Sequence, residues 1–437
     1  MGCLEKLLTF RKGGVHPSSN KALTEHAAIE VMPVPKELDV ILAQHIGTPA
    51  EALVKKGDTV DEGQRIADVK QGLGTTIAAP CHGKIKALGS AGHPTRISTP
   101  SILIETSERE APVYEKHDWS GLAASELLEL IHQGGVVGAG GAGFPTHVKL
   151  RPPAGTTLTE LVINGAECEP YLTADHRLML EEAPKIIEGI RILMTILGVQ
   201  KCYIGIEDNK PDAIEAMSKA ACSDAIVIAP LRTKYPQGGE KQLVYAITGR
   251  RIGSGALPAS VGVVVQNVAT AYAVYEAVVL RKPMIERVVT VSGKGIKRPA
   301  NLRVRVGTRI RDIVEHLDGL QGDVKKVILG GPMMGFATCD LSTPVTKTTS
   351  GLLFLTEDEV DLGEGGACVR CGWCLDACPM GLEPKEIALH VEAGKGKETA
   401  KFGTLDCFEC GSCAFVCPAK RPLVQLIRIA KQNLRNK

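Results

Sequence analysis

Cysteines dominate the C-terminal part of this 437-residue chain, where one spacing is written twice. The run Cys-x2-Cys-x2-Cys-x3-Cys-Pro ends first at Pro379 and again at Pro418. Thiolates at this spacing hold two [4Fe–4S] clusters, and the fourth cysteine of each run ligates the cluster of the other run. The expected ligand sets are Cys368, Cys371, Cys374 and Cys417 for one cluster, and Cys407, Cys410, Cys413 and Cys378 for the other.

Zinc is the alternative occupant, because Cys-x2-Cys pairs also form zinc ribbons. A zinc ion takes four ligands and has no use for a third cysteine at the same spacing or for the proline after the fourth. The remaining cysteines show no pairing rhythm, which indicates buried small side chains or free thiols in a reducing compartment rather than disulfides. They are Cys3, Cys81, Cys168, Cys202, Cys222 and Cys339. The sequence therefore predicts two clusters that carry single electrons.

A glycine-rich stretch between Val136 and Lys149 is the second candidate site. Its glycines are Gly138, Gly140, Gly141 and Gly143. Closely spaced glycines let backbone N–H groups approach a phosphate, and Lys149 can add a positive charge. The GxGxxG pattern alone is a weak signal, because only two valines precede it where a dinucleotide-binding fold places a strand. Phe144 and Pro145 nevertheless argue against a flexible linker, so we expect a phosphate-binding loop.

Strands and helices alternate around and after this loop. We expect helices at 120–133, 181–197 and 211–221, and strands at 161–163, 202–206, 225–229 and 261–265. This alternation predicts a parallel sheet covered by helices, with ligands at the carboxyl ends of its strands. Carboxylates and amides follow several of those ends, in the segments 164–170, 235–241 and 266–270. They indicate a cofactor with many hydrogen-bonding edges.

Composition excludes two other classes of function. The chain has 51 basic and 49 acidic residues and a formal net charge of +2, which gives no indication of a nucleic-acid surface. No apolar run reaches the length of about 18 residues that a membrane-spanning helix requires. Residues 54–60 and 77–85 resemble the turns of a lipoyl- or biotinyl-type barrel, but no lysine stands at the hairpin position. We therefore expect a β-rich packing or docking domain there and no swinging-arm carrier.

The C-terminal segment 423–437 predicts a basic amphipathic helix. Its apolar stripe consists of Leu423, Leu426, Ile427, Ala430 and Leu434. Its basic residues, with those just before it, are Lys420, Arg421, Arg428, Lys431, Arg435 and Lys437. Such a helix could lie against anionic lipid or a membrane subunit, or it could close the cluster module. The sequence leaves both interpretations open.

Taken together, these segments resemble two related families. The glycine loop with Phe144, the Asn-Gly-x-Glu-x-Glu-Pro segment at Asn164, the loop at Glu240 and the segment at Asn267 are similar to the NADH-oxidising flavin subunit of respiratory complex I. Over essentially its full length the chain resembles the RnfC subunit of the Rnf complex, a membrane-bound ferredoxin:NAD oxidoreductase. The order of segments matches, from Lys12-Gly13-Gly14-Val15-His16-Pro17 through the barrel, the flavin domain and the doubled cysteine run.

The resemblance implies an α/β flavin/NAD domain with a parallel sheet, flanked by three other parts. These are a barrel-sandwich-like N-terminal domain, a small β-grasp-like domain of SLBB type and a C-terminal ferredoxin-like α-helical module with two clusters. The expected ranges are 1–34 for an N-terminal arm, 35–110 for the barrel, 118–283 for the flavin domain, 284–350 for the β-grasp domain, 358–422 for the cluster module and 423–437 for the tail.

The resemblance also implies non-covalent FMN, with NAD(H) as substrate. The loop glycines and Lys149 would line the FMN phosphate and ring, and Glu167 would be the catalytic residue beside the isoalloxazine. The other implied cofactor-binding residues are Asn164, Asn267 and Thr270 at the polar edges of FMN, Phe144 and Glu169 at the nicotinamide nucleotide, and Gly239 and Glu240 in the following loop. Ala139, Ala166 and Lys241 depart from the complex I pattern, which has an arginine, an aspartate and a second glutamate there.

The predicted function is that of a translocase subunit that exchanges hydride between NAD(H) and FMN and single electrons between FMN and the clusters. Its partners would be other subunits of the complex, including an iron–sulfur subunit, and indirectly ferredoxin. It would lie peripherally on the cytoplasmic side of the cell membrane.

Two alternatives remain. One is a soluble NADH-dependent reductase of the cobalamin-reductase kind, and the other is a non-catalytic iron–sulfur relay or scaffold. Bleaching of bound FMN by NADH distinguishes catalysis from a relay, and co-sedimentation with membranes distinguishes a member of the complex from the soluble reductase.

Overall fold

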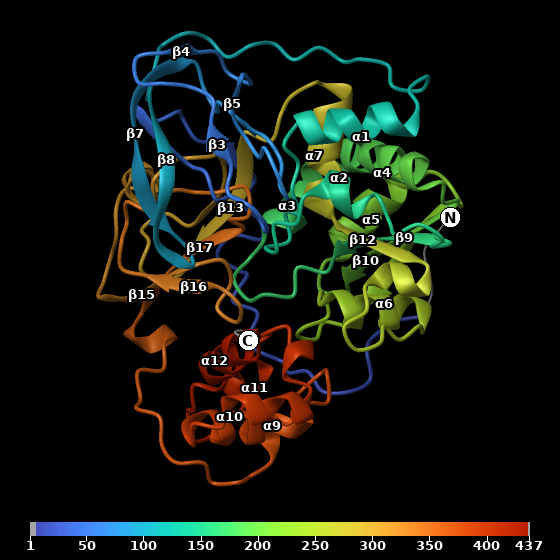
Figure 1. Ribbon diagram of the computed structural model, residues 1–437, viewed down its shortest axis with the longest axis vertical. Helices are drawn as coiled ribbons and strands as arrows, with labels where there is room; N and C mark the ends of the chain where they lie inside the picture. The colour runs from blue at the N-terminus through green and yellow to red at the C-terminus, as the bar shows by residue number, and fades with distance from the viewer. Residues whose placement is uncertain (1–5, 436–437) are drawn as a thin grey trace.

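The computed structural model describes residues 6–435, so the predictions for Cys3 and Lys437 lie outside the described residues. Figure 1 shows a β-rich part, drawn in blue, beside an α/β part drawn in green and yellow, with a second sheet between them. The helical C-terminal module, in red, lies below all three. Within this described part, no helix is long and apolar enough to cross a membrane.

The α/β part is built on a four-stranded sheet in which every pair is parallel, as the alternation predicts. Its order is β11-β10-β9-β12. The strands are β9 (Glu160–Gly165), β10 (Lys201–Glu207), β11 (Ile226–Leu231) and β12 (Val263–Asn267). The sheet is buried on both faces, because neighbouring residues such as Leu161 and Val162 pack into different apolar clusters.

Helices cover both faces of this sheet. They are α1 (Ala124–Gln133), α2 (Thr146–Lys149), α3 (Ala174–Glu181), α4 (Ala183–Leu197), α5 (Pro211–Ala221), α6 (Glu240–Thr248), the 3-10 turn η1 (Pro258–Val261) and α7 (Val268–Val279). The single helix expected at 181–197 is in fact two. Pro184 accounts for the break, because it has no N–H to donate and is tolerated only in the first turn of a helix, which is where it stands in α4.

The N-terminal domain is a barrel of two small sheets. One is antiparallel, in the order β2-β8-β7-β4, and the other is β3-β5-β6. The strands are β2 (Glu37–Ile41), β3 (Glu51–Ala52), β4 (Thr59–Val60), β5 (Arg65–Asp68), β6 (Ile77–Ala78), β7 (Gly83–His93) and β8 (Arg96–Thr106). Leu38, Ile66 and Ile104 lie fully buried between the sheets, so the domain has a core of its own.

A six-stranded mixed sheet, in the order β1-β14-β13-β17-β15-β16, forms the β-grasp part. Its elements are β1 (Ile29–Val31), β13 (Glu286–Ser292), β14 (Ala300–Arg305), α8 (Ile310–His316), β15 (Val324–Leu329), β16 (Phe336–Thr338) and β17 (Gly351–Thr356). The sheet extends beyond the expected range 284–350 at both ends. Strand β17 pairs with both β13 and β15, and β1 belongs to the segment that the sequence predicts only as an N-terminal arm.

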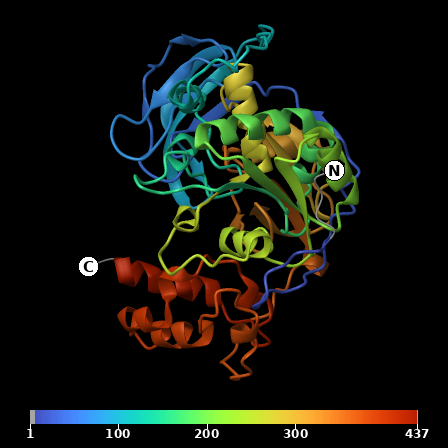
Figure 2. The ribbon, with the colours of Figure 1, turned by 90° about the vertical axis from the view of Figure 1, so that its right-hand side faces the viewer.

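The C-terminal module consists of short helices around the cysteines. They are the 3-10 turns η2 (Glu357–Glu359), η3 (Gly396–Phe402) and η4 (Thr404–Asp406), and the helices α9 (Trp373–Asp376), α10 (Pro384–Glu392), α11 (Ser412–Phe415) and α12 (Leu423–Arg435). In Figure 2 the blue N-terminal arm runs down to this module and back up. The contact is direct, because the Gly14 N–H donates to the Ala377 carbonyl over 2.9 Å.

Helix α12 closes this module, which decides between the two interpretations of the tail. Its residues Leu423, Ile427 and Ala430 are buried in the same apolar cluster as Ile387 and the cluster cysteines. Lys431 is also buried, and it pairs with Glu409. Because the apolar stripe is consumed by packing within the module, little of it is left to lie on lipid.

This packing predicts unequal effects of two isoleucines on α12. Ile427 is 1% exposed, so Ile427→Ala leaves a cavity and should destabilise the module by about 2–5 kcal/mol. Ile429 is 44% exposed, so Ile429→Ala should change its stability by less than about 0.5 kcal/mol. Thermal unfolding followed by cluster absorbance measures both. Equal, small effects would mean that α12 does not belong to the module.

Candidate flavin and iron–sulfur sites

The parallel sheet has its topological switch point between β9 and β12. Strand β9 comes first in the chain, the next two strands add on one side of it, and β12 adds on the other. Ligands of open α/β sheets bind at the carboxyl ends of the strands at such a point. Here the two strand ends place Asn164 directly opposite Asn267. Two residues expected on separate segments are therefore neighbours.

Both asparagines also order the backbone around them. The Asn164 amide donates to the Gly238 carbonyl over 2.9 Å, and its oxygen accepts from the Ala166 N–H over 3.1 Å. The Asn267 oxygen accepts from the Ala269 N–H over 2.8 Å and caps α7. The switch point is thus lined by loops whose positions the two side chains fix.

The glycine loop lies over this point. A side chain on Gly140 would come within 3.5 Å of Asn267. Val136 and Val137 form no strand before the loop; a single bridge from Val137 to Pro145 closes it instead. In the part of the chain that the structure describes, no protein acceptor lies within hydrogen-bonding distance of the N–H groups at 140–142. Such a row of free N–H groups is suited to an anion.

Three parts of the protein fix this loop. From α7, the Thr270 hydroxyl accepts the Ala139 N–H over 2.9 Å. From β13 of the β-grasp sheet, Arg287 donates to the Ala139 carbonyl over 3.2 Å. From the barrel, the Ile46 N–H donates to the Gly143 carbonyl over 3.0 Å. Thr270, expected at an edge of FMN, therefore holds the loop as well.

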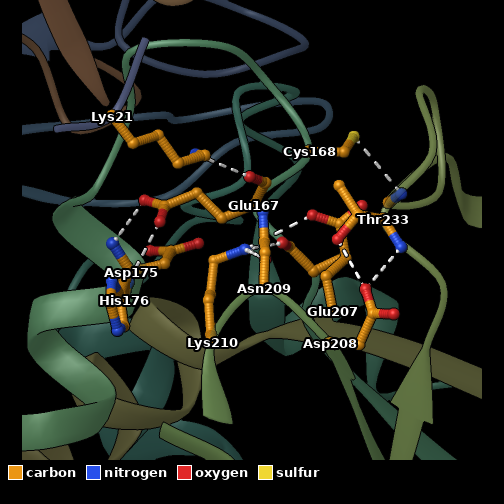
Figure 3. Close-up of polar contacts among 12 residues, drawn as sticks. Lys21, Glu167, Cys168, Asp175, His176, Glu207, Asp208, Asn209, Lys210 and Thr233 are labelled. Carbon is orange, nitrogen blue, oxygen red and sulfur yellow. Dashed lines mark hydrogen bonds and ion pairs between the residues drawn. The ribbon is translucent and has the colours of Figure 1, made fainter. Parts of the chain in front are cut away.

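Glu167 has a structural role that its sequence context did not predict. Its carboxylate accepts the N–H groups of Asp175 and His176 over 2.7 and 3.1 Å, and so caps the start of α3 (Figure 3). Its backbone carbonyl accepts from Lys21 of the N-terminal arm over 3.0 Å. Because these N–H groups already occupy both oxygens, the carboxylate is held toward α3.

Two lysines that sequence reasoning missed hold the same segment. Lys21 donates to the carbonyls of Glu167, Glu169 and Leu172, and Lys210 donates to the Ala166 carbonyl over 2.8 Å. Lys210 also lies 3.3 Å from Glu207, with both side chains fully buried (Figure 3). Neither lysine stands in a motif, so no local signal in the sequence could identify them.

Lys149 and Glu240 are brought together rather than left free. Their side chains form an ion pair of 2.7 Å at the edge of the site, both partly exposed. Phe144 is half-buried at the end of the glycine loop. Gly239 lies on the far side, where a side chain would come 3.3 Å from the ring of Phe408 in the cluster module. The expected cofactor residues thus form a continuous rim that ends at the cysteines.

Glu169 and Tyr235 form the junction between the flavin domain and the cluster module. Glu169 accepts the N–H groups of Met333 and Met334 over 3.0 and 2.9 Å, so it turns toward the β-grasp loop. The fully buried Tyr235 donates to the Cys410 carbonyl over 2.7 Å. The second cysteine run is therefore in direct contact with the flavin domain.

The cysteines of the two runs mix as the crossed pattern predicts. Cys368, Cys371, Cys374 and Cys417 line one cavity, together with Lys385 and Arg421. In the other group, burial raises the pKa of the Cys413 thiol, and the neighbouring thiols of Cys410, Cys407 and Cys378 raise it further. Thiols that surround a space fit a cubane of four irons, which is bound by one thiolate at each iron.

Unpaired polar atoms test whether the switch point fits a flavin. In residues 6–435, the buried atoms without a hydrogen-bond partner include the Thr146 hydroxyl, the Gln237 amide nitrogen and the Gln266 amide nitrogen. Thr146 follows the glycine loop, Gln237 precedes Gly238, and Gln266 precedes Asn267. Buried polar groups are rarely left unsatisfied, so donors around this point fit a ligand with several acceptors, such as a flavin phosphate and ring.

Comparison with protein families divides the chain in the same way. Four family models match: the RnfC barrel sandwich hybrid domain at residues 8–109, the Nuo51 FMN-binding domain at 131–276, the SLBB domain at 288–337 and the 4Fe-4S dicluster domain at 367–420. The FMN-binding match contains the glycine loop and both asparagines.

Full-length relatives decide the family. The RnfC-type subunit of the proton-translocating ferredoxin:NAD(+) oxidoreductase complex of Clostridium ljungdahlii is 45% identical over 98% of this chain and 94% of its own. Its counterpart in the Na(+)-translocating complex of Acetobacterium woodii is 40% identical over 97% and 96%. The chain belongs to the RnfC family of ion-translocating oxidoreductase complexes. The relative from Rhodobacter capsulatus is 44% identical over 97% of this chain and 83% of its own.

A solved structure shows the same fold at low identity. An NAD+-reducing [NiFe]-hydrogenase in its H2-reduced state has a chain that is 18% identical, with a TM-score of 0.52. The match covers 73% of this chain and 61% of the hydrogenase chain, so this chain spans about three fifths of the other's length. The comparison supports the fold alone.

These matches confirm the predicted family and the fold class. They also confirm an electron-transfer function within such a complex, FMN, and two [4Fe–4S] clusters. The individual ligands of these groups remain predictions. So does the role of Glu167.

The environment of Glu169 predicts a pH dependence of stability. Burial raises the pKa of Glu169 from its ordinary 4.5 to about 7. Between these values the folded chain holds a proton that the unfolded chain has lost, so stability should fall as pH rises through this window. Glu169→Gln, which cannot ionise, should lose this slope in thermal unfolding midpoints. Glu115→Gln, at an exposed position, should keep it; an unchanged slope in Glu169→Gln contradicts the assignment.

Proposed function

We propose that the switch point holds FMN, with the phosphate on the glycine loop and the ring toward Asn164 and Asn267. The observation that carries this proposal is the row of free N–H groups at 140–142 above the paired strand ends. The positive charge of Lys149 stands at the rim, where its ion pair with Glu240 limits its freedom to reach the phosphate. When bound, FMN converts between hydride exchange, which moves two electrons, and the single electrons that a cubane carries.

NAD(H) would enter from the exposed side of the glycine loop. Phe144 is half-buried there and can stack on a nucleotide ring. We assign Glu167 to keeping the loop between Asn164 and α3 in shape, through its two N–H contacts, and we retain its proximity to the ring as the prediction to be tested. Glu169 contributes at the β-grasp loop, away from that entrance.

The cluster module would exchange electrons with FMN at the Cys407 site and with the next carrier at the Cys368 site. The support is positional: Tyr235 and Gly239 of the flavin domain approach Cys410 and Phe408, next to Cys407. The Cys368 cavity is formed by other cysteines, of which Cys371 is exposed. Lys385 and Arg421 line this cavity, and their positive charges would favour an anionic cluster.

Within the family, this function makes the chain the NAD(H)-linked subunit of a membrane-bound ferredoxin:NAD oxidoreductase. Its partners would be the other subunits, including an iron–sulfur subunit that exchanges electrons with the Cys368 site, and ferredoxin would be reached indirectly. We propose a peripheral position on the cytoplasmic side of the membrane. Protease access in inside-out vesicles but not in right-side-out vesicles would support it, and the reverse would refute it.

The catalytic proposal predicts flavin bleaching. The purified chain, loaded anaerobically with FMN, should lose flavin absorbance on addition of NADH in a stopped-flow instrument. Glu167→Gln keeps the shape of the side chain and should keep FMN, while slowing the bleaching if the carboxylate acts near the ring. Glu181→Gln, on α3 itself, is the matched control. Wild-type protein that binds FMN but is not bleached would leave the iron–sulfur relay as the function.

The crossed ligand sets predict which cluster a single cysteine supports. Cys378→Ala should damage the cluster of Cys407, Cys410 and Cys413, and should leave the cluster beside it in sequence intact. Iron analysis should fall from about eight towards about four per chain. Electron paramagnetic resonance identifies the surviving cluster, and Cys222→Ala, at an exposed cysteine outside both runs, is the control. Loss of the Cys368 cluster instead would show that the sets are not crossed.

A further inference from the structure

Arg287 is a buried guanidinium whose position has no explanation in the sequence. It lies on β13 of the β-grasp sheet and is 5% exposed. Its Nε donates to the Thr349 carbonyl over 3.3 Å, and its Nη2 donates to the Ala139 carbonyl over 3.2 Å. In residues 6–435 it forms no ion pair with a carboxylate, and Asp175 supplies only a longer-range attraction. A buried charge without a paired counter-ion is costly, so its presence calls for a function.

The contact with Ala139 orients the next peptide N–H. The bond between Ala139 and Gly140 is trans, so the Ala139 carbonyl and the Gly140 N–H lie in one plane and point in opposite directions. Arg287 holds the carbonyl toward the β-grasp sheet. The Gly140 N–H is therefore directed to the opposite side, where Gly140 and Gly141 are exposed.

Thr270 holds the same residue from its other end. Its hydroxyl accepts the Ala139 N–H, so both backbone groups of Ala139 are engaged by side chains from two different parts of the protein. A glycine-rich loop has many accessible conformations, and fixing one of them before binding removes an entropic cost. A charged donor on the carbonyl also polarises the peptide and strengthens its N–H as a donor.

We propose that Arg287 is a positioning residue for the flavin phosphate: from the β-grasp sheet, it sets the glycine loop so that its free N–H groups face the phosphate. This role rests on the proposed FMN site and adds a residue from a neighbouring domain to it. The ligand chemistry is specific, because a fixed row of N–H groups favours the phosphate of FMN and is indifferent to the flavin ring.

Riboflavin, which has the same ring but no phosphate, is the matched probe. The full chain with its clusters is stripped of flavin and titrated anaerobically with FMN and with riboflavin, followed by flavin fluorescence. For Arg287→Met, the Kd for FMN should rise about tenfold to a hundredfold, while the Kd for riboflavin should change less than about threefold. The preference for FMN over riboflavin should therefore fall.

Arg303→Met is the control. Arg303 stands on the neighbouring strand β14 and lines the same internal cavity as Arg287, but it pairs with Glu286 and Glu182. Its loss should lower the thermal stability and leave the preference for FMN unchanged. A fall in preference as large as that of Arg287→Met would show general damage and overturn the proposal.

Arg287→Lys provides the test if the methionine variant does not fold. Lysine keeps the charge but lacks the planar fork that reaches two carbonyls, so the preference should fall in the same direction by a smaller factor. Folded variants with the wild-type preference, or with equal losses for both flavins, overturn the role of Arg287 and leave the FMN site in place. A wild-type chain that binds neither flavin overturns the proposed site itself.

Discussion

The peptide of Ala139 is the point on which the flavin side of the molecule depends. Its N–H is held from α7, its carbonyl from the β-grasp sheet, and the loop that it begins is held at Gly143 by the barrel. A loop with four glycines has no conformation of its own to enforce. The three domains must therefore pack correctly before the loop has a shape, which makes the cofactor site a property of the whole assembly rather than of one domain.

A second set of contacts joins this site to the cysteines. Tyr235, Glu169 and the β-grasp loop at Met333 meet beside Cys410, and each comes from a different segment. A side chain on Gly411 would approach the Met333 carbonyl to 2.7 Å, so the backbones here are in close contact. Close packing fixes the distance between the flavin domain and the nearer cluster site, on which the rate of electron exchange depends.

Periodicity and motif spacing were sufficient for most elements and for the two sites. The α/β alternation predicts β9, β10 and α5 nearly to the residue, and the doubled run predicts both thiol groups. What could not be predicted has one cause: Lys21, Arg287 and Tyr235 act across long sequence separations and carry no local pattern. Glu167 shows the reverse error, because a motif names a residue without saying that the helix after it will use the carboxylate. The amphipathic stripe of α12 was ambiguous for the same reason, since periodicity shows that a face is covered but not by what.

The N-terminal arm has a consequence for how the chain comes to be folded in the cell. It is synthesised first, but it docks on partners made later, at Leu231, Ala377 and β14. Gly13, at φ +67°, lies so close to the Cys378–Pro379 peptide that a side chain would approach it to 2.6 Å. Domains generally fold in the order in which they leave the ribosome. The arm must instead wait for the last domain, whose shape in turn depends on iron and sulfide being delivered. Delivery of the clusters thus becomes the event that secures both ends of the chain, and a protein that misses it presents loose ends to proteases.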